Sequence, residues 1–215
     1  YNACPGAIIA DTMIMKDAPE RMLQAGLGDM LAKYIALCEW RISHIVTGEY
    51  YCEDIANLMR GSLTKIMTAA PYLLSRDPEV TEAVAEGLIL SGIAMAFAQV
   101  SRPASGLEHY FSHLWEMFAL ERGLPLELHG IQVGVGTVLT MRVYDRLRRI
   151  RPDRATAEAA MRAFDPAKWE ANVRRVFGEA AQTLIDSENN LWHKNDPQLQ
   201  AQRLDRILTH WDEIL

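Results

Sequence analysis

Apolar residues recur along most of this chain every three or four positions, which is the period of an α-helix that buries one face. The pattern is clearest over residues 22–40 and 80–97. The second of these segments is apolar nearly all round, as expected for a central buried helix. Further helical stretches span residues 51–74, 106–120, 129–143 and 197–215. The chain is therefore predicted to be an all-α, multi-helix bundle.

Aspartates and prolines mark where several of these helices should begin. An aspartate side chain accepts hydrogen bonds from the first free N–H groups of a helix, and proline fits the first turn. The expected starts are Asp17-Ala18-Pro19-Glu20, Asp77-Pro78, Asp153 and Asp165-Pro166.

Two glycines interrupt the first long helical pattern. Gly26 and Gly28 each cost about 1 kcal/mol relative to alanine inside a helix, so they indicate close approach of another backbone or a kink. Asp29 follows directly, and it is either the cap of a helix that restarts or a ligand facing the core. The spacing leaves both interpretations open. A second break is expected at Gly61-Ser62, and Pro71 should end or kink that helix.

A short apolar run at the start of the chain reads differently. Residues 7–10, Ala-Ile-Ile-Ala, lie between Pro5-Gly6 and Asp11 and are typical of a single strand. One strand needs a neighbour to be stable, and the rest of the sequence offers no convincing second strand and no glycine-rich dinucleotide-binding turn. We therefore expect any dinucleotide-binding domain to lie outside this sequence.

Composition narrows the class of protein. The chain has 215 residues, of which 49% are hydrophobic and 23% charged, as in an ordinary globular domain. A net charge of -6 argues against binding nucleic acid. The longest apolar run, residues 87–100, is too short to cross a bilayer, so no membrane partner is expected. The absence of a secretory leader and three cysteines without paired spacing, Cys4, Cys38 and Cys52, favour a cytoplasmic location.

Three histidines form the strongest chemical pattern. His109 and His113 follow the breaker-rich residues 101–106 and share one helix face, because they are four positions apart. His129, followed by Gly130, opens the next helix. These imidazoles could converge on a metal ion where helix ends meet, although His113 could equally be a core residue or face a substrate. His44, His193 and His210 stand alone and are interpreted as surface or partly buried residues.

Three motifs in order resemble a known family. They are residues 18–21 with 26–33, Ser101-Arg102-Pro103-Ala104-Ser105-Gly106-Leu107-Glu108-His109 with Ser112-His113, and residues 129–137. Together they resemble the C-terminal domain of sn-glycerol-1-phosphate dehydrogenases, in particular the bacterial AraM-like branch. That family belongs to the dehydroquinate synthase-like and iron-containing alcohol dehydrogenase superfamily.

The resemblance implies a two-domain enzyme that interconverts glycerol 1-phosphate and dihydroxyacetone phosphate. NAD(H) or NADP(H) would bind an N-terminal Rossmann-like domain, and a divalent metal would bind the helical domain through Asp29, His109 and His129. Zinc is the first choice, with nickel or iron as alternatives. His113 would lie near the substrate and relay its proton. Lys33 stands where some iron-dependent relatives carry a fourth ligand, a histidine, and this favours a three-residue site.

The substrate phosphate needs cationic groups or N–H donors. Arg102, Lys33 and Ser105 are the candidates, although Arg102 and Lys33 could instead form structural ion pairs. The resemblance further implies a homodimer and a small phosphorylated substrate. It also implies that this chain lacks its N-terminal half and is inactive alone, with residues 1–16 as the remnant of the nucleotide-binding domain and 17–215 as the helical domain.

Two other functions fit the same sequence. Another polyol or alcohol dehydrogenase, or a cyclitol synthase of the same superfamily, would use the same metal scaffold. A non-catalytic helical interaction domain would bury the histidines as core residues and bind no metal.

Overall fold

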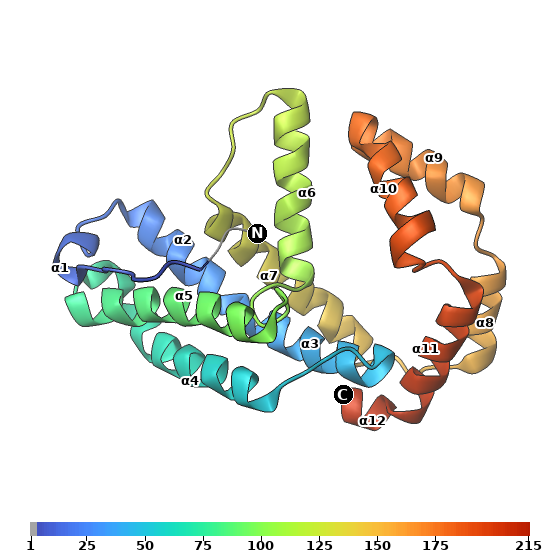
Figure 1. Cartoon of the computed structure of the whole chain (residues 1–215), viewed down its shortest axis with the longest axis horizontal. Helices are drawn as coiled ribbons and strands as arrows, with labels where there is room; N and C mark the ends of the chain where they lie inside the picture. Colours follow the sequence, from blue (N-terminus) through green and yellow to red (C-terminus); the bar gives the residue numbers. More distant parts are fainter. Residues whose placement is uncertain (1–3) are drawn as a thin grey trace. The chain divides into compact units, whose positions relative to one another are not determined.

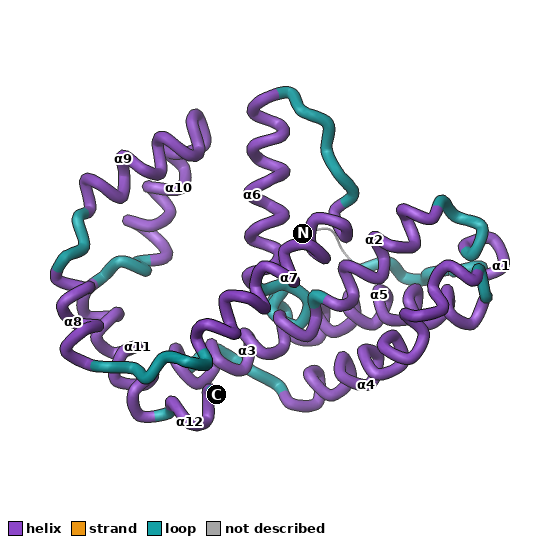
Figure 2. Tube along the Cα trace, turned by 180° about the vertical axis from the view of Figure 1, so that it is seen from behind, coloured by secondary structure: helices purple, strands orange, loops and turns teal. Residues whose placement is uncertain are grey.

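The computed structural model describes residues 4–215 and contains helices but no strand within that range (Figures 1 and 2). The all-α prediction is confirmed. The elements are α1 Thr12–Met15, α2 Glu20–Leu31, α3 Lys33–Thr47, α4 Glu53–Ala69, η1 Ala70–Ser75, α5 Pro78–Ala98, α6 Leu107–Arg122, α7 His129–Leu147, α8 Arg154–Arg162, α9 Pro166–Phe177, η2 Gly178–Ala180, α10 Ala181–Ser187, η3 Glu188–Trp192, α11 Pro197–Thr209 and α12 Trp211–Ile214.

The predicted strand over residues 7–10 is wrong. These residues have neither helical nor strand structure, and Ile9 is 96% exposed. A strand requires a hydrogen-bonding neighbour, and none exists among residues 4–215. The chain instead enters the short helix α1, where the Asp11 carboxylate accepts hydrogen bonds from the Met13 and Ile14 N–H groups. Residues 1–3 of the predicted remnant lie outside the described residues.

The predicted helix starts are largely confirmed. Asp77, Asp153 and Asp165 are the N-caps of α5, α8 and α9, and each carboxylate accepts a backbone N–H of its helix. Helix α2 begins at Glu20, but its N-cap is Pro19 and Asp17 provides no cap. The C-terminal helical pattern is divided at His210 between α11 and α12.

The breaks predicted at glycines do not occur. Helix α2 runs through Gly26 and Gly28, and α4 runs through Gly61. The interruption between α2 and α3 lies at Ala32 instead. Asp29 is therefore inside α2, so the interpretation of Asp29 as the cap of a restarted helix is wrong. The prediction for Pro71 is confirmed: α4 ends at Ala69, and Pro71 lies in the first turn of the 3-10 helix η1 that follows.

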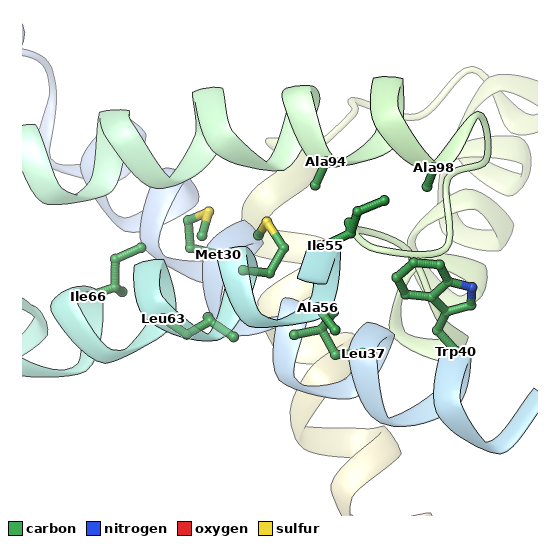
Figure 3. Packing of buried hydrophobic residues seen from close by; sticks show 10 residues of the cluster. Met30, Leu37, Trp40, Ile55, Ala56, Leu63, Ile66, Ala94 and Ala98 are labelled. Atoms are coloured by element: carbon green, nitrogen blue, oxygen red, sulfur yellow. The ribbon is translucent and has the colours of Figure 1, made fainter. Parts of the chain in front are cut away.

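The described chain divides into two compact units. The first runs to Arg41 and resumes with Tyr50–Arg146, and the second consists of Ile42–Glu49 and Leu147–Leu215. All candidate site residues lie in the first unit. Its main core is formed by side chains of α2 to α5 (Figure 3). Trp40 is fully buried there, and its indole N–H donates to the Tyr50 carbonyl oxygen at 2.7 Å.

Helix α5 is buried on one side only. Val80, Val84, Ala94 and Ala98 are buried, whereas Phe97 is 67% exposed. The helix is also the one described helix that is long and apolar enough to cross a membrane by length and composition, and 39% of its apolar window is buried. Core helices of soluble proteins meet the same criterion, so the expectation of no membrane partner stays a prediction.

Candidate metal centre

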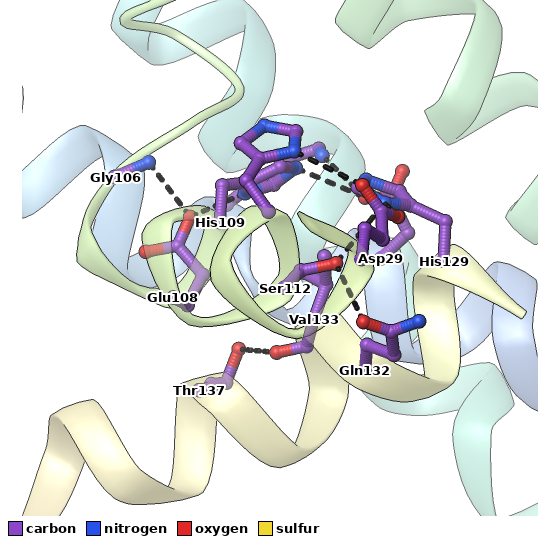
Figure 4. Close-up of polar contacts among 12 residues, drawn as sticks. Asp29, Gly106, Glu108, His109, Ser112, His129, Gln132, Val133 and Thr137 are labelled. Atoms are coloured by element: carbon purple, nitrogen blue, oxygen red, sulfur yellow. Dashed lines mark hydrogen bonds and ion pairs between the residues drawn. The ribbon is translucent and has the colours of Figure 1, made fainter. Parts of the chain in front are cut away.

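Helices α2, α6 and α7 bring one donor side chain each to a common point. Asp29 lies near the end of α2, His109 in the first turn of α6, and His129 is the first residue of α7. One ligand atom of each residue lies within 4.8 Å of those of the other two (Figure 4). The structure thus brings together the three residues that the family resemblance implies as ligands, and their role as ligands stays a prediction.

Direct backbone contact between α2 and α7 explains why Asp29 and His129 meet. A Cβ atom at Gly28 would lie 2.3 Å from the Gly130 carbonyl oxygen, and one at Gly130 would lie 1.9 Å from the Ala25 carbonyl oxygen. Neither position has room for a side chain, because backbone atoms cannot rotate away. Gly28 precedes Asp29 and Gly130 follows His129, so the glycine contact brings the backbones of both residues close together. Of the two meanings predicted for Gly28, close approach is the one observed.

One carboxylate oxygen of Asp29 contacts both the Lys33 ammonium group and the His109 ring. Its Oδ1 lies 3.1 Å from Lys33 Nζ and 3.5 Å from His109 Nε2. Burial alone raises the pKa of Asp29, but the hydrogen bond with His109 and the charge of Lys33 outweigh burial and lower that pKa to about 2. The carboxylate is therefore negatively charged at neutral pH, as a metal ligand must be.

Glu108 contacts the ring nitrogen of His109 that points away from Asp29. His109 Nδ1 lies 2.8 Å from Glu108 Oε1, which also accepts the Gly106 N–H at 2.8 Å. Burial lowers the pKa of His109, but the contacts with Asp29 and Glu108 outweigh it and leave that pKa above its ordinary value. Glu108 is fully buried, and its second oxygen has no hydrogen-bond partner in the described part of the chain. This arrangement directs His109 Nε2 towards Asp29.

His129 and His113 share one carboxylate. Glu116 Oε1 lies 2.9 Å from His129 Nδ1, and Glu116 Oε2 lies 3.2 Å from His113 Nδ1. Burial raises the pKa of Glu116, but the two histidines lower it below its ordinary value. The His113 side chain is 54% exposed, and its ring centroid lies 6.1 Å from that of His109. The core interpretation of His113 is therefore wrong, and the residue lies at the open edge of the cluster.

The three donors fit a small divalent cation. Metal bonds of about 2.0–2.1 Å at tetrahedral angles place neighbouring ligand atoms about 3.4 Å apart, and Asp29 Oδ1 and His109 Nε2 are 3.5 Å apart. One carboxylate and two imidazoles suit zinc, nickel or iron. Lys33 lies against Asp29 and offers an ammonium group, which has no lone pair to give a metal. Lys33 is therefore unsuited to be a fourth ligand, and the three-residue site stays a prediction.

Each candidate phosphate-binding residue interacts with another part of the protein. Lys33 is 2% exposed and is paired with Asp29. Burial raises the pKa of Glu39, and the nearby charge of Arg102 counteracts that increase. Ser105 is half-buried, and its N–H donates to the Ser101 carbonyl oxygen at 3.0 Å. Ion-pair roles are thus observed for Lys33 and indicated for Arg102, while phosphate binding stays a prediction.

The sequence interpretation missed the residues that surround the histidines. Glu108 adjoins His109, and Glu116 is three residues after His113 on the same helix, so both could have been noticed as local acids. The contacts of Ser112 and Glu116 with His129 depend on the packing of α6 against α7 and leave no local signal.

No protein-family model matches the chain. Among curated proteins, glycerol-1-phosphate dehydrogenase (NAD(P)+) of Bacillus licheniformis is 35% identical over 195 residues, which cover 88% of this chain and 49% of that protein. The enzyme of the same name from Pyrococcus furiosus is 42% identical over 135 residues, or 63% of this chain and 38% of that protein. The Caldivirga maquilingensis enzyme is 41% identical over 137 residues, or 64% and 39%.

The fold and the group of three donor side chains define a class of protein: a helical domain in which one carboxylate and two imidazoles meet at helix ends. The chain matches curated glycerol-1-phosphate dehydrogenases at 35–42% identity, as expected for the C-terminal domain of that family. It spans about half the length, or less, of the curated relatives it matches. The resemblance to the family's C-terminal helical domain agrees with these matches and with the all-helical fold.

Proposed function

We propose that this chain is the helical, metal- and substrate-binding part of an NAD(P)-linked glycerol-1-phosphate dehydrogenase, which interconverts glycerol 1-phosphate and dihydroxyacetone phosphate. The observation that carries the proposal is the convergence of Asp29, His109 and His129 within 4.8 Å. The names of the relatives support the reaction. The dinucleotide would bind a domain outside this chain, and the complete enzyme would be a cytoplasmic homodimer.

In this proposal Asp29, His109 and His129 hold a divalent cation, with zinc preferred over nickel or iron. When bound, that cation would polarise the substrate oxygen, and the nicotinamide would exchange the hydride. The protein side chains prepare the site for this chemistry. The hydrogen bond with His109 and the charge of Lys33 keep Asp29 ionised, and the carboxylates of Glu108 and Glu116 hold the two imidazoles in place.

His113 is the proposed proton-transfer residue. It lies one helical turn after His109, its side chain is 54% exposed, and Glu116 contacts its Nδ1. Its Nε2 can therefore take a proton from a substrate hydroxyl, while the Glu116 carboxylate stabilises the imidazolium that forms. The exposed edge also gives that proton a path to solvent.

The substrate phosphate is assigned to the loop that leads into α6. Arg102 and Ser105 are both half-buried there, close in sequence to His109. Lys33 acts chiefly as the counter-ion of Asp29 in this proposal, because its side chain is only 2% exposed. Phosphate binding by Lys33 would require the Asp29 pair to open.

The test is oxidation of NADH and NADPH by dihydroxyacetone phosphate, with the full-length polypeptide and zinc, nickel or iron supplied in turn. We expect activity that disappears on chelation and in His129→Ala. Metal binding without activity on this substrate would reject the reaction and direct the assay to glycerol and other polyols. Absence of metal binding would reject the metal centre itself and favour a non-catalytic helical domain.

A further inference from the structure

A chain of hydrogen bonds fixes which nitrogen of His129 carries its hydrogen. It begins at Gln132, whose Nε2 donates to the Glu127 carbonyl oxygen at 3.1 Å. Because that carbonyl can only accept, the amide must present its nitrogen there and its oxygen on the other side. Gln132 Oε1 therefore faces Ser112, whose hydroxyl donates to it at 3.4 Å (Figure 4).

The Ser112 hydroxyl then becomes an acceptor for His129. A serine has one hydroxyl hydrogen, and Ser112 uses it on Gln132. Its oxygen lies 3.2 Å from His129 Nδ1 and can only accept from that atom. Glu116 Oε1, 2.9 Å from the same Nδ1, is a carboxylate oxygen and also accepts. Both neighbours require a hydrogen on Nδ1, so the lone pair of the neutral ring is on Nε2.

His129 needs such external support more than His109 does. The His129 side chain is 43% exposed, whereas that of His109 is 9% exposed. A packed imidazole is held by its surroundings, but a half-exposed ring can rotate and change tautomer unless hydrogen bonds hold it. Ser112 is fully buried and Gln132 is 6% exposed, so the bonds to His129 start from rigid positions.

We propose that Glu116 and Ser112 are positioning residues that fix His129 as the Nδ1–H tautomer and present its Nε2 to the cation. This inference rests on the proposed metal centre. Glu116 also holds His113 through its second oxygen, so one carboxylate sets both a metal ligand and the proposed proton-transfer residue. Glu108 has the corresponding contact with His109, which gives α6 one supporting carboxylate for each imidazole ligand.

The zinc affinity of the full-length polypeptide tests the inference. The dissociation constant would be measured by competition with a chromophoric chelator for the parent, Glu116→Gln and Glu116→Ala. Loss of an outer partner of a ligand typically weakens metal binding by about 10–100-fold. We expect Glu116→Ala to fall in that range, Glu116→Gln to lose less because its amide oxygen can still accept, and Ser112→Ala to lose less still. The matched control is Glu121→Gln, an exposed residue on the same helix, which should bind zinc like the parent.

A second readout separates positioning from a merely structural role. In the metal-free protein, nitrogen-15 spectra of labelled histidine report the tautomer of each ring. We expect the Nδ1–H form for His129 in the parent and a mixture of tautomers in Glu116→Ala, with unchanged thermal unfolding. Parent-like zinc affinity together with a parent-like His129 tautomer in Glu116→Ala would overturn the positioning role. If the parent bound no zinc, the proposed metal centre would fail, while the tautomer spectra would still decide what Glu116 does.

Discussion

Gly136 of α7 lies directly against the backbone of Glu108 of α6, where a Cβ atom at position 136 would be 2.5 Å from the Glu108 carbonyl oxygen. Glu108 is the residue before His109. Gly28 and Gly130 are likewise in backbone contact, and they are the chain neighbours of Asp29 and His129. Each candidate ligand is thus the chain neighbour of a residue in backbone contact with another helix, and this arrangement sets the geometry of the centre.

Substituting Gly28 tests that arrangement. In Gly28→Ala the new methyl group meets a backbone oxygen, so α2 and α7 must separate. We expect the free energy of unfolding to fall by about 1–3 kcal/mol and zinc affinity to fall with it. Gly61→Ala is the control, because that helical position is exposed with no atom within 4 Å of the new Cβ. It should stabilise the protein by about 0.5–1 kcal/mol in urea unfolding. Equal effects of the two substitutions would contradict the close approach.

Replacing Lys33 by methionine should change two quantities in opposite directions: the metal-free protein should become less stable, and zinc binding should become tighter. Lys33→Met keeps the unbranched shape and most of the length of a side chain that is 2% exposed, but removes the ammonium partner of Asp29. We expect the metal-free protein to lose about 1–3 kcal/mol of unfolding free energy because a partly buried charge loses its pair. Zinc binding should become tighter, since no ammonium group then opposes the cation. Weaker zinc binding in calorimetric titration would mean that Lys33 orients Asp29 for the metal.

The main core can be tested at Trp40 of α3, a helix that carries none of the three candidate ligands. The indole is fully buried and donates to the Tyr50 carbonyl oxygen. Trp40→Phe removes buried volume and leaves that oxygen without its donor, and we expect a loss of about 2–4 kcal/mol. Trp192→Phe, at a residue that is 42% exposed, should change unfolding by less than about 0.5 kcal/mol. Comparable losses at both tryptophans would be evidence against this core.

Glu39 should make the free energy of unfolding depend on pH, and its surroundings determine the sign of that dependence. Burial raises the pKa of Glu39, partly offset by hydrogen bonds from Tyr144 and the Leu107 N–H. A carboxyl whose folded pKa is above its unfolded pKa is protonated more readily in the folded state, so ionisation costs stability as pH rises. The unfolding free energy of the parent minus that of Glu39→Gln should therefore be largest at acidic pH. It should fall as pH passes upwards from the ordinary glutamate pKa through the raised one. A difference that increases over this interval in urea titrations would have the wrong sign.

Local sequence predicted the helices but not every property of their ends. The helical period and the Asp77 and Asp165 caps are encoded by neighbouring residues, and the structure confirms them. The apolar run at residues 7–10 has strand character, yet strand formation depends on a partner that no local pattern supplies. Because glycine weakens helices, Gly28 predicted either close approach of another backbone or a kink, and only the tertiary contact with Gly130 shows that close approach is the reason.

In the candidate metal centre, too, contacts within one helix could be predicted from the sequence and contacts between helices could not. His109 and His113 could be placed on one face from their spacing alone, while Asp29 was open between cap and ligand until the family resemblance was considered. The structure excludes the cap because Asp29 lies inside α2. The support of His129 by Glu116 could not be predicted, because thirteen residues and a turn between two helices separate them.

Metal content of purified variants tests the central claim most directly. The full-length parent, Asp29→Ala, His109→Ala, His129→Ala and His113→Ala would be loaded with zinc, passed through a desalting column and analysed by mass spectrometry for bound metal. The account predicts about one zinc per chain in the parent and in His113→Ala, as in a single catalytic site, and loss of that zinc in each of the other three. Zinc retained by all three ligand variants, or lost equally from His113→Ala, would contradict a centre built from Asp29, His109 and His129.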